Sequence, residues 1–263
     1  MNKICRDFME KKCNRQNCRF IHDKNICYHF WKFGKCKFGD NCRKKHNIEK
    51  HKKNTETFEP NYNPPDMRVV MEFGKQKSEL DLKVRDVVLI PDLFIQNKKN
   101  EIYEKLVDEL DKCGNILKLW HGDTHLIADD KLGWKEKCPT FMMVIDKIRD
   151  YFGMDIKATR FNWYGSDQHK PFHFDAAGVN PEKAKTQNFT VGVSFGYTRE
   201  IAFEEVDGKK VVSFPCPDGF VYAFCREMNT KWRHGIPAVK VEDDVNSGRI
   251  SVIAWGWKDQ KEL

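Results

Sequence analysis

The sequence predicts an α+β protein in which a small cysteine-rich segment precedes a larger domain of antiparallel β-strands covered by two helices. Six of the ten cysteines lie within the first 42 residues, where aliphatic residues are too few to build a core. Short apolar runs bounded by Gly, Pro, Asp or Asn dominate after Lys157, which is typical of an antiparallel sandwich, barrel or small jelly roll. At 263 residues, the chain is long enough for one sizeable core and an appendage.

The composition argues against a disordered chain and against a membrane protein. Charged residues make up 32% of the chain and hydrophobic residues 40%, enough for one core. The longest apolar run, Val87 to Ile95, is interrupted by Asp92 and is shorter than the roughly 18 residues of a membrane-spanning helix. The first residues, MNKICRDFMEKK, lack the apolar stretch of a secretory signal. We therefore expect an intracellular protein, in the nucleus or the cytoplasm, with no membrane partner and with reduced cysteines.

The positive charge is concentrated at one end of the chain. Residues 1–54 hold 16 Lys and Arg against 5 Asp and Glu, whereas the remaining residues hold 30 against 34. A short cationic segment is suited to a polyanion, because each phosphate that it neutralises releases condensed counterions. The alternative is a solvated basic tail.

The cysteines of this segment fall into two similar sets, each ending in Cys-x3-His. The sets are Cys5, Cys13, Cys18, His22 and Cys27, Cys36, Cys42, His46. Three thiolates and one imidazole form a closed tetrahedral shell for Zn²⁺, so the sequence predicts two zinc sites. We expect the segment to fold only when metal is bound.

The two motifs, ICRDFMEKKC with CRFIH and ICYHFWKFGKC with CRKKH, resemble the CCCH zinc-finger family over residues 4 to 46. Most members of that family bind single-stranded RNA, which makes RNA the expected partner and leaves DNA possible. Aromatic rings beside cations suit unstacked bases. Phe20 and Phe38, with Arg19 and Arg43, are the candidates for this contact. The alternative is a zinc module that binds protein.

The pattern along the chain divides it into four segments. They are a first finger (1–24), a second finger (25–48), a polar linker (49–66) and a β-rich domain (67–263). Helical periodicity is predicted from Asn100 to Cys113 and from Pro139 to Phe152. The expected strands include ATRFNWY, NFTVGVSF, EIAFEE, KVVSF, GFVYAF and GRISVIAW.

The segment PFHFDAAG carries a candidate metal site. His173 and Asp175 are two residues apart on an extended segment, so their side chains project from one face. A third ligand from a distant strand, His234 in TKWRHGIP, would complete the two-histidine, one-carboxylate triad that holds non-haem Fe(II) and leaves positions open for substrates. Arg249 begins the last predicted strand and could hold a carboxylate of a co-substrate through a bidentate pair.

These residues resemble the AlkB-like branch of the 2-oxoglutarate- and Fe(II)-dependent dioxygenases, through RFNWYGSDQHKPFHFD, VGVSFG and GRISVIAW. The resemblance implies a double-stranded β-helix, or jelly-roll, dioxygenase domain flanked by helices. It implies iron on His173, Asp175 and His234. It also implies 2-oxoglutarate on Asn162, Tyr164 and Arg249, with O₂ as a second co-substrate.

Two positions depart from the family pattern. The family commonly has a second Arg six residues after the first, and here that position is Trp255. Base-repair members have an acidic residue two positions after the metal-binding Asp, and here it is Ala177. The identity of a target base therefore does not follow from the resemblance, nor does the full set of co-substrate contacts.

The segment LWHGDTHLIADDK holds two further histidines and a tryptophan. We interpret His121 and His125 either as part of a lid over the pocket, with Trp120 stacking on a base, or as ordinary surface loop residues.

The leading hypothesis joins the two halves of the chain. The fingers capture single-stranded RNA, or DNA, and the iron pocket oxidises an N-methyl group on a base, which then leaves as formaldehyde. One alternative is a protein side-chain hydroxylase that is recruited to RNA. Another is an RNA-binding protein with an inert β domain. The oligomeric state stays open.

Overall fold

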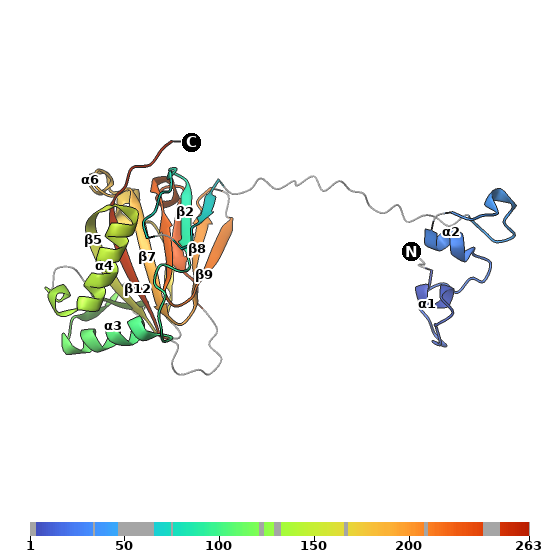
Figure 1. Cartoon of the computed structure of the whole chain (residues 1–263), viewed down its shortest axis with the longest axis horizontal. Helices are drawn as coiled ribbons and strands as arrows, with labels where there is room; N and C mark the ends of the chain where they lie inside the picture. Colours follow the sequence, from blue (N-terminus) through green and yellow to red (C-terminus); the bar gives the residue numbers. More distant parts are fainter. Residues whose placement is uncertain are drawn as a thin grey trace. The chain divides into compact units, whose positions relative to one another are not determined.

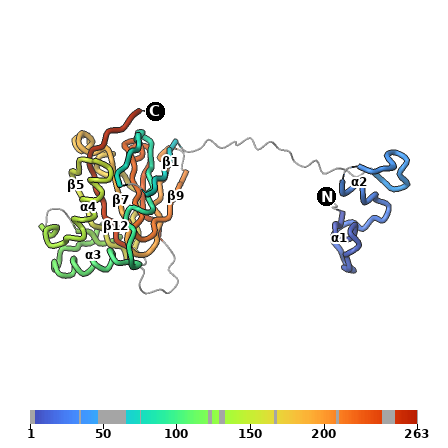
Figure 2. The backbone as a smooth tube through the Cα atoms, viewed as in Figure 1, coloured from blue at the N-terminus to red at the C-terminus, as the bar shows by residue number. Residues whose placement is uncertain are grey.

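The computed structural model describes residues 4–33, 35–46, 66–74, 76–120, 124–128, 133–165, 168–207, 210–238 and 248–262. The chain divides into two compact units, Met1–Asn63 and Pro64–Leu263, here called the head and the body (Figures 1 and 2). The predicted linker, residues 49–66, lies outside the described residues except for Asp66. Within the described part of the chain, no helix is both long enough and apolar enough to cross a bilayer.

The head repeats one small motif twice. Its short elements are α1 (Arg6–Met9), α2 (Tyr28–Phe33) and the 3₁₀ turn η1 (Gly39–Asn41). In each half, the backbone N–H of the first cysteine donates to a carbonyl near the last ligand, Cys5 to Ile21 and Cys27 to Lys45. These pairings close each half into a loop that brings its two ends together.

Eight strands among the described residues form the larger sheet of the body. In spatial order they are β1 (Arg68–Met71), β2 (Asp86–Ile90), β10 (Phe220–Phe224), β7 (Phe189–Gly196), β12 (Arg249–Trp257), β5 (Asp155–Tyr164), β4 (His125–Ala128) and β3 (Leu117–Trp120). Only the pair of β1 with β2 is parallel. The central strands are buried on both faces, which agrees with their nearly continuous apolar sequences.

A second sheet of four described strands faces the first. In spatial order they are β6 (Lys170–His173), β11 (Trp232–Ile236), β8 (Arg199–Glu205) and β9 (Val211–Cys216), all antiparallel. One apolar cluster fills the space between the two sheets and includes Tyr164, Ile201, Phe203, Tyr222 and Trp232. The candidate site residues lie at the edge of this inner layer.

Two helices cover the other face of the large sheet (Figure 1). They are α3 (Glu101–Lys112) and α4 (Pro139–Phe152), and η3 (Lys135–Lys137) precedes α4. Pro139 at the start of α4 and Gly153 at its end, with φ of 59°, set its limits. A second apolar cluster packs Phe141, Val144 and Ile148 against the outward side chains of the sheet.

The predicted fold class is confirmed, because two facing sheets of antiparallel strands with a helical cover form a jelly roll. The expectation that everything after Lys157 is β-like is wrong at one place. The short helices α5 (Ala176–Val179) and α6 (Pro181–Ala184) and the turn η4 (Arg226–Asn229) lie there. The Asn180 side chain accepts the N–H groups of Glu182 and Lys183, which starts α6.

Candidate functional site

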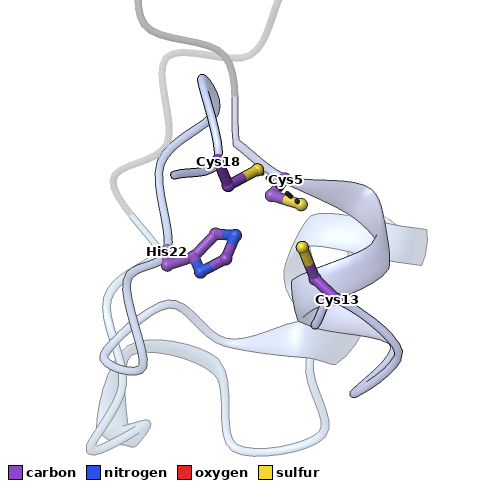
Figure 3. A group of neighbouring side chains, drawn as sticks. All are labelled: Cys5, Cys13, Cys18 and His22. Carbon is purple, nitrogen blue, oxygen red and sulfur yellow. Dashed lines mark hydrogen bonds between the residues drawn. The ribbon is translucent and has the colours of Figure 1, made fainter. Parts of the chain in front are cut away.

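Each half of the head gathers its predicted zinc ligands into one cluster. The ligand atoms of Cys5, Cys13, Cys18 and His22 lie within 4.8 Å of one another (Figure 3), and those of the second set are equally close. The backbone N–H of Phe30 donates to the Cys27 sulfur and lowers the pKa of this thiol to about 7, which favours the thiolate that binds zinc. The thiolate and imidazole donor sets fit tetrahedral Zn²⁺.

The aromatic residues of the head divide into two groups. Phe8 stacks on His22 and Phe30 stacks on His46, with ring centroids 4.2 and 4.3 Å apart, so both rings support a ligand. Phe38 is instead 58% exposed, and Lys37 lies 4.9 Å above its ring.

The other pair predicted to contact bases lies in the first finger. Phe20 is half-buried, with the guanidinium of Arg19 5.1 Å from its centroid. Arg43 is exposed. Phe20 and Phe38 therefore each carry a cation beside the ring, and their contact with bases stays a prediction.

The body brings His173, Asp175 and His234 together from distant parts of the chain. His173 at the end of β6 pairs with His234 on β11, and Asp175 follows β6. One Asp175 oxygen lies 3.5 Å from Nε2 of His234 and 3.9 Å from Nε2 of His173. Gly235 permits this approach, because a Cβ there would lie 2.7 Å from the Lys170 carbonyl of β6.

Neighbouring groups orient the three ligands. Nδ1 of His173 lies 2.9 Å from the Pro171 carbonyl, to which it can only donate, so Nε2 is left with a free lone pair. The hydroxyl of Thr190 donates to the second Asp175 oxygen at 3.0 Å. Nε2 of His173 is buried without a protein partner among the described residues. An orphaned imidazole nitrogen that faces a buried carboxylate fits a metal cation.

The protonation states also favour metal binding. Burial, the neighbouring His234 and Lys170 lower the pKa of His173 to about 3, so its imidazole is neutral. Burial alone would raise the pKa of Asp175, but the charge and hydrogen bond of His234 outweigh burial and lower it. The cluster therefore presents the forms that bind a divalent cation, a neutral imidazole and a carboxylate.

Asn162, Tyr164 and Arg249 lie on the inner face of the large sheet, next to the metal cluster. In the register of β5 with β12, Tyr164 lies opposite Arg249, and the Arg249 guanidinium is 5.3 Å from the Tyr164 ring centroid. Arg249 is fully buried and its Nε donates to Ser194 at 2.8 Å. Both of its Nη atoms lack partners among the described residues.

A second buried arginine, Arg199 on β8, faces the same region and was not predicted. Its Nη2 donates to the carbonyls of Gln168 and Pro237, whereas Nε and Nη1 lack partners within the described residues. Burial and the nearby Arg249 lower the pKa of Arg199. No carboxylate among the described residues forms an ion pair with either guanidinium. Two buried cations with unpaired N–H groups fit an anionic ligand such as a carboxylate.

The lid interpretation of His125 is wrong, and His121 lies outside the described residues. His125 is fully buried on β4, because its side chain takes an inward position beneath Tyr164, on which it stacks at 4.6 Å. Its Nε2 lies 3.3 Å from the side-chain oxygen, Oδ1, of Asn162. The Asn162 side-chain amide in turn donates to the backbone carbonyl of Ser251 at 3.2 Å. His125 thus orients Asn162.

Two cavities meet at the metal cluster. The inner one is small, with a volume of about 20 Å³, and is lined by Asn162, Tyr164, Tyr222 and Ser251. An outer open hollow of about 360 Å³ is lined by Trp120, Arg160, Lys183 and Gln187. Lys170, His173, Asp175 and Trp255 border both. Trp255 therefore lines the pocket, whereas the outer hollow is bordered by Ala176 and not by Ala177.

Fold and site together define the body as a jelly roll with a two-histidine, one-carboxylate cluster between its sheets. No family model matches the chain. It is similar to a solved oxidoreductase of the 2OG-Fe(II) oxygenase family from Burkholderia pseudomallei, with a TM-score of 0.42 and 18% identity over 64% of this chain and 82% of that one. It is also similar to OsALKBH1, with a TM-score of 0.43 and 14% identity over 64% of this chain and 97% of that one.

The head has a relative of its own. Over 50 residues the chain is 38% identical to a zinc finger CCCH domain-containing protein of Schizosaccharomyces pombe, a match that covers 17% of this chain and 13% of that protein. The chain thus spans only a small part of that relative.

Proposed function

We propose that this chain is an RNA-binding, Fe(II)- and 2-oxoglutarate-dependent dioxygenase that removes a methyl group from an N-methylated base in single-stranded RNA or DNA. The observation that carries the proposal is the convergence of His173, Asp175 and His234 in a fold that also buries two guanidiniums, each with two nitrogen atoms that lack partners among the described residues. A metal site and an anion site next to each other are what a keto-acid-dependent oxygenase requires.

His173, Asp175 and His234 would hold iron from β6, β11 and the N-terminal end of α5. The two cavities that these residues border would be left for the co-substrate and the substrate. Iron bound with 2-oxoglutarate supplies an oxidant for C–H bonds from O₂, and releases succinate and CO₂. The chain positions the substrate and limits water at the site.

The 2-oxoglutarate site is formed by residues of four strands. We assign the distal carboxylate to Arg249 and Arg199, whose unpaired N–H groups would find acceptors there. Tyr164, between His125 and Arg249, forms the wall of this site. Arg199 supplies the second positive charge that Trp255 does not provide. Binding of this carboxylate by both arginines would also offset the free-energy cost of burying two like charges.

The head supplies the nucleic-acid contact in this proposal. Residues 1–54 keep a net positive charge of about +9 after zinc binding, since each zinc with three thiolates contributes −1 to a formal charge of +11. A single strand held by the head has a raised local concentration at the iron site, because both belong to one chain. A single strand also avoids the cost of extracting a base from a duplex.

The proposal is tested with the full-length protein loaded with Fe(II) under nitrogen. The protein is mixed with 2-oxoglutarate and either methylated RNA, methylated DNA or a cell lysate, and O₂ is then admitted. We expect succinate and formaldehyde in equal amounts with methylated RNA, and neither product with His173→Ala. Succinate without formaldehyde, and only with lysate, would favour a protein hydroxylase. No succinate in any mixture would contradict an oxygenase.

A further inference from the structure

Cations predominate among the charged side chains that line the outer hollow beside the metal cluster. The cations Arg160, Lys170 and Lys183 border it. They come from β5, β6 and α6, three separate elements. Asp175 is the single carboxylate among the described residues that line it. A ligand in this hollow therefore meets positive charge from several sides.

The charge of Asp175 is not free to meet a substrate. One of its oxygens faces both histidines, at 3.5 and 3.9 Å, and the other accepts the Thr190 hydroxyl. A metal in the cluster would engage this carboxylate further. The described lining of the hollow thus offers hydrogen-bond donors and cations, without a carboxylate that is free for a positively charged ligand.

Arg160 is held in a defined orientation. Its guanidinium carbon lies 4.4 Å from the Trp120 ring centroid and 5.2 Å from that of Trp255, so the two indoles hold the guanidinium. Its buried Nε lacks a partner among the described residues. The stacked rings occupy the flat faces, which leaves the N–H groups along the edge for an acceptor in the hollow. Lys170 adds further donors beside the metal cluster.

We infer that the hollow selects a methylated base that stays uncharged after methylation and that directs carbonyl oxygens to Arg160 and Lys170. Bases of this class include 3-methyluracil and 1-methylguanine. Methylation at N3 of cytosine or N1 of adenine instead creates a cation with an amino group at the edge, which would meet three like charges. This inference rests on the proposed function, since it assigns the substrate class of the same site.

Two RNAs that differ at one base test the inference. They share a short single-stranded sequence with one 3-methyluridine or one 3-methylcytidine, bases of nearly equal shape, and a third RNA is unmodified. Binding to the full-length protein with Fe(II) and 2-oxoglutarate is measured under nitrogen by fluorescence anisotropy. Because the flanking sequence is constant, contacts of the head with phosphates cancel in the comparison. We expect 3-methyluridine RNA to bind at least about tenfold more tightly than 3-methylcytidine RNA.

Variants of the wall identify the cause of the preference. Lys183→Glu should reduce the preference more than the neutral variant Lys183→Gln, and Arg160→Gln should weaken 3-methyluridine RNA selectively. The inference is overturned if 3-methylcytidine RNA binds as tightly, if these variants leave the preference unchanged, or if neither methylated RNA binds better than the unmodified one. Admitting O₂ then tests the proposed function separately, since absence of succinate would contradict catalysis whatever the order of binding.

Discussion

The head buries three apolar side chains among its described residues, Cys5, Ile26 and Cys27, whereas the body buries an apolar cluster on each face of its large sheet. Both units gather histidines with anionic ligands, three thiolates in each finger and one carboxylate in the body. The metal clusters of the head take the place of a core, whereas the cluster of the body lies at the edge of a core that exists without it. This difference is the one expected between structural zinc sites in the head and the catalytic iron site that we propose for the body.

Metal removal gives the largest difference between the two units. Structural zinc contributes about 10–16 kcal/mol of apparent folding free energy in small fingers, so a chelator should unfold the head and leave the body folded. Amide NMR spectra of the full chain with and without chelator measure this. Cys36→Ala should bind one zinc by native mass spectrometry and lose only the second finger. Two retained zinc ions, or unchanged head resonances, would contradict a metal-built head.

The ligand set of the body is tested by His234→Ala. We expect its Fe(II) affinity under nitrogen to fall at least about 100-fold, because removing even an outer-shell partner usually costs 10–100-fold. Thermal unfolding of the metal-free protein should show a folded body with a lower midpoint, because the apolar clusters remain but the buried Asp175 carboxylate loses its partner His234. His169→Ala, at an exposed position, is the matched control and should bind Fe(II) normally. Equal Fe(II) affinity in both variants would remove His234 from the site.

Arg199→Gln tests the second cation of the anion site. Losing a charged hydrogen bond of about 1.5–3 kcal/mol should weaken 2-oxoglutarate binding roughly 10- to 100-fold, with Fe(II) affinity unchanged. Isothermal titration calorimetry under nitrogen measures both constants. The control is Arg233→Gln on β11, because Arg233 pairs with Glu204 and lies outside both cavities. A wild-type Kd in Arg199→Gln would leave Arg249 to hold the carboxylate alone.

The aromatic contacts of the head have a smaller effect. Phe38→Ala should weaken binding of single-stranded RNA by about 1–3 kcal/mol if its ring stacks on one base. The control Phe73→Ala changes an equally exposed ring in the body, 57% against 58% exposed, and should bind RNA normally. Equal affinity of both variants would assign Phe38 no base contact.

The smallest effect that we expect from a single substitution is on the salt dependence of RNA binding. If Arg43 neutralises one phosphate, Arg43→Gln should lower the slope of log affinity against log salt by about 0.7 for a single strand. Anisotropy titrations at several salt concentrations measure this slope. A slope equal to that of the wild type would show that Arg43 does not contact the RNA backbone.

The roles of residues that lie close together in the sequence, on one face of one strand, can be predicted from the sequence. The roles of residues whose partners come from distant segments cannot. Both helices, the main strands and the pair His173 and Asp175 follow from periods and spacing alone. In the sequence, Arg199 lies beside the charged residues of an ordinary edge strand. Its position near Arg249 follows only from the packing of one sheet against the other. His125 looks like a loop residue because a buried neutral histidine carries no local signal.

The most direct test of the site is the visible charge-transfer absorption that a 2-oxo acid produces when it chelates ferrous iron. Fe(II) and 2-oxoglutarate are added under nitrogen to the full chain, to His173→Ala and to Arg249→Gln. We expect the band with the wild type, none with His173→Ala, and a band that needs far more 2-oxoglutarate with Arg249→Gln. A wild-type protein that binds no Fe(II), or gives the same spectrum as His173→Ala, would contradict the account.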